Sequence, residues 1–109
     1  MYKFKSRAAG DLIMLEPNGR QILTIIGKYH GPADSKGILL PEQMPAAIAA
    51  LEAAVAQDEA RQAELARDAK AEGKEPPKSE GISLRQRALP FIEMIRRCQK
   101  AEMEIVWGV

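Results

Sequence analysis

The stretch from residue 57 to residue 80 limits what this chain can fold into more than any other feature. It holds twelve charged residues in 24 positions and a single large apolar side chain, Leu65. Such a segment cannot bury enough surface to offset the entropy lost when it is ordered. We therefore predict a solvated helical extension followed by a mobile linker over residues 57–80. The chain is then one domain, residues 1–109, whose core comes from the two pieces on either side.

The composition excludes several classes of protein. One Cys and one His among 109 residues rule out a disulfide framework, a Cys/His zinc site and a His-rich catalytic centre. Sixteen basic and fifteen acidic residues nearly cancel, so overall charge does not favour a polyanion as partner. No apolar run is long enough for a transmembrane helix or a signal peptide. We therefore expect a soluble, cytoplasmic protein without membrane association.

The first piece opens with an alternation of apolar and basic residues that predicts a strand over residues 2–7. Tyr2 and Phe4 fall on one face of this strand, and the basic side chains fall on the other. Residues 11–16 lose the alternation, which predicts a central strand covered on both faces. Asn18 is placed to cap a helix over residues 19–26.

The second half of the chain predicts two longer helices and a final strand. Met44, Ile48, Leu51 and Val55 recur at helical spacing and predict a helix over residues 45–56. Residues 83–102 predict an amphipathic helix that begins at a Ser83–Gln86 capping box. Residues 104–107 read as a strand that joins the first two. The predicted fold is α+β, with a small, mainly antiparallel sheet of about three strands covered by about three helices.

The sequence contains no recognised catalytic or cofactor motif, so we expect no cofactor and no metal. His30, Asp34 and Ser35 share a predicted surface loop over residues 28–37, but one loop rarely aligns a nucleophile, a base and an orienting group. A small-ligand or enzymatic site in this loop is the weakest hypothesis. Cys98 falls on the apolar arc of the last helix, which predicts a buried and unreactive thiol.

Two groups of basic side chains are candidates for polyanion contacts. They are Lys3, Lys5 and Arg7 on the first strand, and Arg85, Arg96 and Lys100 on one flank of the last helix. Joined on one surface, the two groups would follow a phosphate backbone. Glu93, however, lies at ion-pairing distance in sequence from Arg96, and aromatic residues make up only 5% of the chain, too few for a base-stacking platform. A nucleic-acid-associated accessory protein is therefore the alternative hypothesis.

Five blocks of the sequence resemble a small proteobacterial family, the domain of unknown function numbered eighteen-forty. The blocks are residues 2–6, 10–20, 38–44, 83–90 and 106–108. The resemblance implies a bacterial, cytoplasmic, stand-alone domain and brings no activity, ligand or site with it.

The leading functional hypothesis is a non-enzymatic protein–protein interaction module, with another protein or a second copy of the chain as its partner. The exposed helical extension and the free edges of a small sheet favour it.

Overall fold

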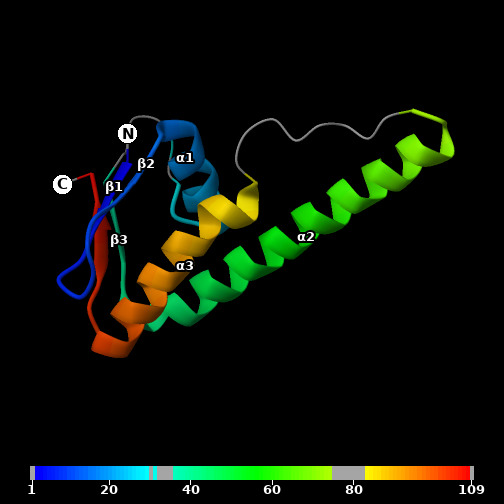
Figure 1. The fold of residues 1–109 in the computed structure, drawn as a ribbon. Helices are drawn as coiled ribbons and strands as arrows, with labels where there is room; N and C mark the ends of the chain where they lie inside the picture. Colours follow the sequence, from blue (N-terminus) through cyan, green and yellow to red (C-terminus); the bar gives the residue numbers. More distant parts are fainter. Residues whose placement is uncertain (1, 30, 32–35, 75–82, 109) are drawn as a thin grey trace.

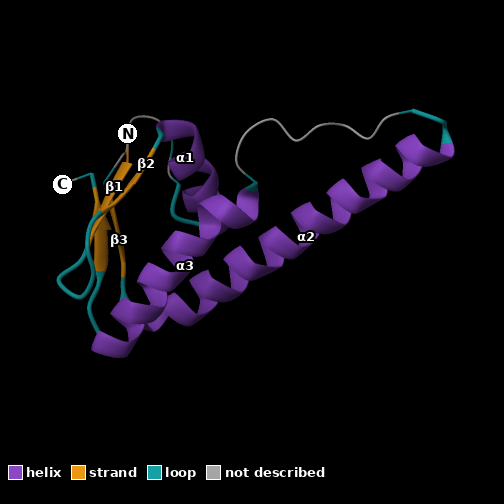
Figure 2. Cartoon of the chain, in the orientation of Figure 1, coloured by secondary structure: helices purple, strands orange, loops and turns teal. Residues whose placement is uncertain are grey.

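A computed structural model describes residues 2–29, 31, 36–74 and 83–108 of the chain. This part of the chain forms two layers, a four-stranded antiparallel sheet and a layer of three α-helices that lies on one face of the sheet (Figures 1 and 2). The α+β class predicted from the sequence is confirmed.

The two strands that are farthest apart in the sequence form the centre of the sheet. The strands are β1 (Tyr2–Lys5), β2 (Leu12–Met14), β3 (Gly37–Leu39) and β4 (Ile105–Trp107), and their order is β2-β1-β4-β3. Phe4 lies opposite Leu12 on one side and opposite Trp107 on the other. The final strand therefore joins the sheet as predicted, and it does so between β1 and β3.

Strand β3 is the element that the sequence did not predict, since about three strands were expected and the sheet has four. Its three residues follow a segment rich in Gly, Pro, Asp and Ser and come almost directly before Pro41, so they carry too little pattern to be recognised as a strand. The register explains its place, because Gly37 lies opposite Trp107 and the indole ring lies directly against it. Any side chain at residue 37 would overlap that ring.

Helix α1 (Glu16–Ile25) begins three residues earlier than predicted. Its N-cap is Leu15, and Pro17 fits the first turn because the first backbone N–H groups of a helix need no partner within it. The prediction that Asn18 caps the helix is wrong. Asn18 lies inside α1, where its side-chain oxygen accepts a hydrogen bond of 2.9 Å from Arg87 of the last helix.

Helix α2 (Met44–Ala71) is one continuous helix of 28 residues, preceded by the short 3-10 helix η1 (Pro41–Gln43). The residues after 56, for which the sequence predicts a solvated helical extension, continue α2 as far as Ala71, and α2 projects well beyond the other helices (Figure 1). Its last buried residue is Val55, so burial ends where the apolar spacing of the sequence ends. Residues 75–80 of the predicted linker lie outside the described residues.

Helix α3 (Leu84–Ala101) begins at the predicted capping box. The Ser83 hydroxyl accepts a hydrogen bond of 3.2 Å from the Gln86 backbone N–H, and the Gln86 side chain accepts one of 3.1 Å from the Ser83 N–H. Pro90 lies within the helix and is exposed, so its ring stands away from the core.

The aromatic ring of Phe4 stands at the centre of the core. Its centroid lies 4.7 Å from that of Phe91 on α3 and 5.6 Å from that of Trp107 on β4, and the ring of Tyr2 stacks beside it at 6.2 Å. This cluster joins the central strands to the helical layer. Trp107 and Cys98 are both buried in the core, as predicted.

The contact between Gly37 and Trp107 predicts a strong effect of the smallest possible substitution. Gly37→Ala should lower the free energy of unfolding by about 1–3 kcal/mol, because the added methyl group forces the indole or β3 to move. Gly10→Ala is the matched control, since nothing lies within 4 Å of a methyl group there, and it should stay within about 1 kcal/mol of wild type. Urea unfolding of both variants measures the difference, and equal stabilities would contradict the packing described.

Burial of Tyr2 predicts a loss of stability at high pH. Burial, together with the nearby Tyr29 and Glu16, raises the pKa of the Tyr2 phenol above its ordinary value of 10.0, against an opposing effect of Arg20. The contribution of the neutral Tyr2 phenol to the free energy of unfolding is complete below pH 10. It is lost as the pH rises through the folded-state pKa, because the phenol ionises first in the unfolded chain. Unfolding measured from pH 8 to 11.5 should therefore show a steeper decline above pH 10 in wild type than in Tyr2→Phe. Parallel curves would show that Tyr2 plays no part.

Candidate functional site

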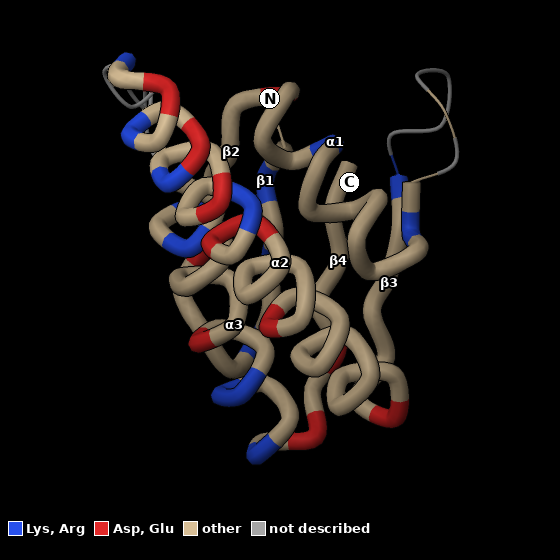
Figure 3. The backbone as a smooth tube through the Cα atoms, turned by 90° about the vertical axis from the view of Figure 1, so that its right-hand side faces the viewer, with Lys and Arg blue, Asp and Glu red and all other residues tan. Residues whose placement is uncertain are grey.

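The described helices cover one face of the sheet, and no described element covers the other (Figures 1 and 3). Tyr2, Phe4 and Trp107 point into the core, so their strand neighbours must point outward. The register aligns these outward residues in rows, because partners in an antiparallel pair share a face. The resulting surface, called the open face below, consists of Lys3, Lys5, Ile13, Ile38 and Val106.

The open face is rich in exposed aliphatic side chains. The side chain of Ile13 on β2 is 57% exposed, and that of Ile38 on β3 is 42% exposed. Val106 on β4 lies directly opposite Ile38 and is partly buried. The prediction that the strand around residues 11–16 is central and covered on both faces is wrong. It forms the edge strand β2, and Ile13 points away from the helices.

Cationic side chains accompany these aliphatic residues. Lys3 pairs with Asp11 at 3.5 Å. Neither Lys5 nor Arg7 has an ion-pair partner within 4.0 Å in the described part of the chain. A shallow hollow of about 350 Å³ adjoins them and is lined by Lys5, Ser6, Arg7, Glu104 and Val106. Two cations and one aliphatic side chain thus border the same hollow.

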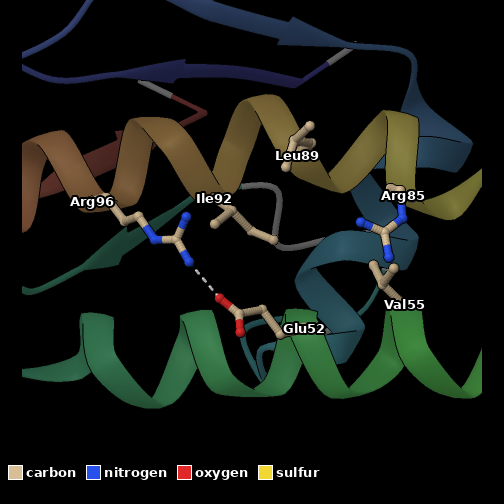
Figure 4. A pocket seen from close by; sticks show the side chains of 6 residues that line it. All are labelled: Glu52, Val55, Arg85, Leu89, Ile92 and Arg96. Carbon is tan, nitrogen blue, oxygen red and sulfur yellow. Dashed lines mark hydrogen bonds and ion pairs between the residues drawn. The ribbon is translucent and has the colours of Figure 1, made fainter.

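A second hollow of about 400 Å³ lies between α2 and α3 (Figure 4). Its lining residues are Glu52, Val55, Arg85, Leu89, Ile92 and Arg96. Arg96 pairs with Glu52 at 2.6 Å, and Arg85 pairs with Glu59 of the same helix α2. The charges in this groove are therefore matched within the chain, and the two ion pairs connect α2 to α3.

The structure separates the two groups of basic residues that the sequence singled out. Lys3 and Lys5 lie on the open face, and Arg7 follows β1 in the adjoining bend. Arg85 and Arg96 lie in the groove of the helical layer, and Lys100 lies in the last turn of α3. Arg96 pairs with Glu52 of α2, whereas the spacing in the sequence suggested a pair with Glu93. The six residues do not form one surface.

The described residues contain no group of three side chains that could hold a metal ion. The Cys98 thiol is buried, as predicted, and donates a hydrogen bond of 3.1 Å to the Ser6 hydroxyl. His30, Asp34 and Ser35 lie outside the described residues. Among the helices described, none combines the length and apolar character needed to cross a membrane.

Sequence reasoning missed the aliphatic residues of the open face. The run Leu12-Ile13-Met14-Leu15 looks like a fully buried strand, and Ile38 lies in a segment that carried no strand signal. Only the pairing of β2 and β3 with the central strands shows that Ile13 and Ile38 share a face. The outward alternation of Lys3 and Lys5 was the one available signal, and it was interpreted correctly.

The fold and the open face define a two-layer α+β domain with one uncovered sheet face. The chain belongs to the family described as Domain of unknown function (DUF1840), whose model matches residues 1–107. This confirms the family resemblance inferred from the sequence. No curated protein and no solved structure matches the chain.

The groove predicts a weak, salt-sensitive ion pair between Arg96 and Glu52. Both side chains are more than half exposed, so water screens their attraction. A double-mutant cycle of Arg96→Gln and Glu52→Gln should give a coupling of about 0.2–1 kcal/mol by urea unfolding. The coupling should shrink in 1 M NaCl, where the Debye length is about 3 Å. A coupling above about 2 kcal/mol that persists in salt would contradict this description of the groove.

Proposed function

We propose that the protein is a small, non-enzymatic interaction module of the bacterial cytoplasm that binds a protein partner through the open face. The observation that carries the proposal is the exposure of Ile13 and Ile38 on the same uncovered face of the sheet. The cytoplasmic location is supported by the presence of one buried free cysteine, Cys98, and by the family resemblance.

A solvated face would be expected to carry polar side chains at these positions. Antiparallel sheets commonly expose one face to water, and such a face usually alternates polar residues with the buried ones. On the open face, three of the five residues are aliphatic. Isolated exposed aliphatic residues are common, whereas aliphatic residues gathered on one face favour a binding surface.

The same geometry favours a protein over a nucleic acid as the partner. A surface that follows a phosphate backbone needs its cations together, and here Lys3 and Lys5 lie on the sheet whereas Arg85 and Arg96 lie in the groove between α2 and α3. Four of the five aromatic residues are buried in the core, which leaves no aromatic platform on the open face for stacked bases.

Site-specific photo-crosslinking in cells tests the proposal. A photoreactive amino acid at Ile38 should form adducts with a protein, and the same group at Leu65 on the projecting part of α2 should form none. The two positions make a matched pair, because their side chains are 42% and 43% exposed. Adducts at Leu65 alone would place binding on α2. Adducts that disappear on nuclease treatment would favour nucleic acid, and their absence at both positions would overturn the interaction module.

A further inference from the structure

We infer that the occupant of the open face is a single amphipathic α-helix of a partner protein, with an aliphatic stripe and flanking carboxylates. The inference rests on the proposed function and adds the size, the shape and the charge of the partner segment. Each of the three follows from a different property of the open face.

The area of the open face sets the size of the occupant. Four strands spaced about 4.8 Å apart, with three or four residues each at about 3.4 Å, give a flat area of about 200–260 Å². A stable interface between two globular proteins buries about 800 Å² on each side. The open face is therefore too small to hold a globular protein or a second copy of this chain by itself. It is wide enough for one helix, whose diameter with side chains is about 10 Å.

The positions of the aliphatic residues set the shape of the occupant. Ile13 on edge strand β2 lies in one row with Lys3, whereas Ile38 on edge strand β3 lies in the next row with Val106 and Lys5. Ile13 and Ile38 are therefore three strand spacings apart across the sheet and two residues apart along it, about 16 Å in all. A helix that crosses the strands obliquely covers this distance in about eleven residues at 1.5 Å each. Aliphatic residues at spacings of three and four along such a helix form a continuous stripe that can contact all three side chains. The added helix would give the sheet a helical layer on both faces, a common layer arrangement.

The charges beside the aliphatic residues set the charge of the occupant. The open face and its border carry three cations, Lys3, Lys5 and Arg7, against two anions, Asp11 and Glu104. Of the three cations, only Lys3 forms an ion pair with a described residue. Lys5 and Arg7 border the hollow next to Val106, so a carboxylate on the flank of the docked helix would reach both cations. A second copy would place the same cations against its own, which is unfavourable.

Binding of two designed peptides tests the inference. The probe is a fluorescent 18-residue amphipathic helix with a leucine stripe and glutamate flanks, and the control peptide carries lysine in place of every glutamate. Full-length protein should bind the glutamate peptide at least tenfold more tightly, as measured by anisotropy, and the difference should shrink in high salt. The variants Lys5→Glu and Arg7→Glu should each weaken this binding at least fivefold. Lys70→Glu, the same charge change on the exposed end of α2, should leave it unchanged.

The variant Ile38→Ser removes an aliphatic side chain from the open face and leaves the charges unchanged, so it measures the aliphatic contribution to peptide binding. Circular dichroism checks that every variant is folded. Equal affinity for both peptides, binding insensitive to Lys5→Glu, or no binding of the glutamate peptide would overturn the acidic helix as occupant. Adducts at Ile38 would still support the proposed function in each of these cases. A dimer in sedimentation that Ile38→Ser dissociates would identify a second copy as the occupant. Displacement of the glutamate peptide by a 20-nucleotide DNA would identify a polyanion.

Discussion

The pairing of the first strand with the last is the constraint on which the rest of this structure depends. β1 and β4 are separated by almost the whole chain, and they lie side by side at the centre of the sheet. Phe4 and Trp107 face each other in this pair, and Phe91 of α3 packs against Phe4. Removing either strand would therefore divide the sheet and uncover the ring cluster that attaches the helices. The short edge strands β2 and β3 add to this central pair and could not form a sheet without it.

The same pairing determines the chemistry of both faces. Because side chains alternate along a strand, the aromatic residues that point into the core leave Lys3, Lys5 and Val106 pointing outward. The chain has only five aromatic residues, and the core uses four of them. The outer face is thus built from aliphatic and basic side chains, which suits an apolar surface flanked by carboxylates better than stacked bases.

Much of the fold could be predicted because its signals are local. The capping box at Ser83, the apolar spacing that ends at Val55 and the alternation at Tyr2 and Phe4 each depend on only a few neighbouring residues. The failures concern non-local structure. Strand β3 depends on Gly37 fitting beneath Trp107, some 70 residues away in the chain, and Asn18 bonds to Arg87, 69 residues away, instead of capping α1. The candidate site was harder still, since only the strand order shows that Ile13 and Ile38 share one face of the sheet.

The long helix α2 explains why we propose the sheet as the binding surface and not the part of α2 that projects from the molecule. Where α2 is packed, Glu52 and Glu59 are paired with Arg96 and Arg85, so its charges are satisfied within the chain. Beyond Val55 the described part of α2 has no buried residue and one large apolar side chain, Leu65. A docked partner needs several apolar contacts in a row, because a single side chain contributes too little to offset the loss of freedom on binding. The open face offers three aliphatic residues on a rigid sheet, held in place by the strand pairing that also builds the core.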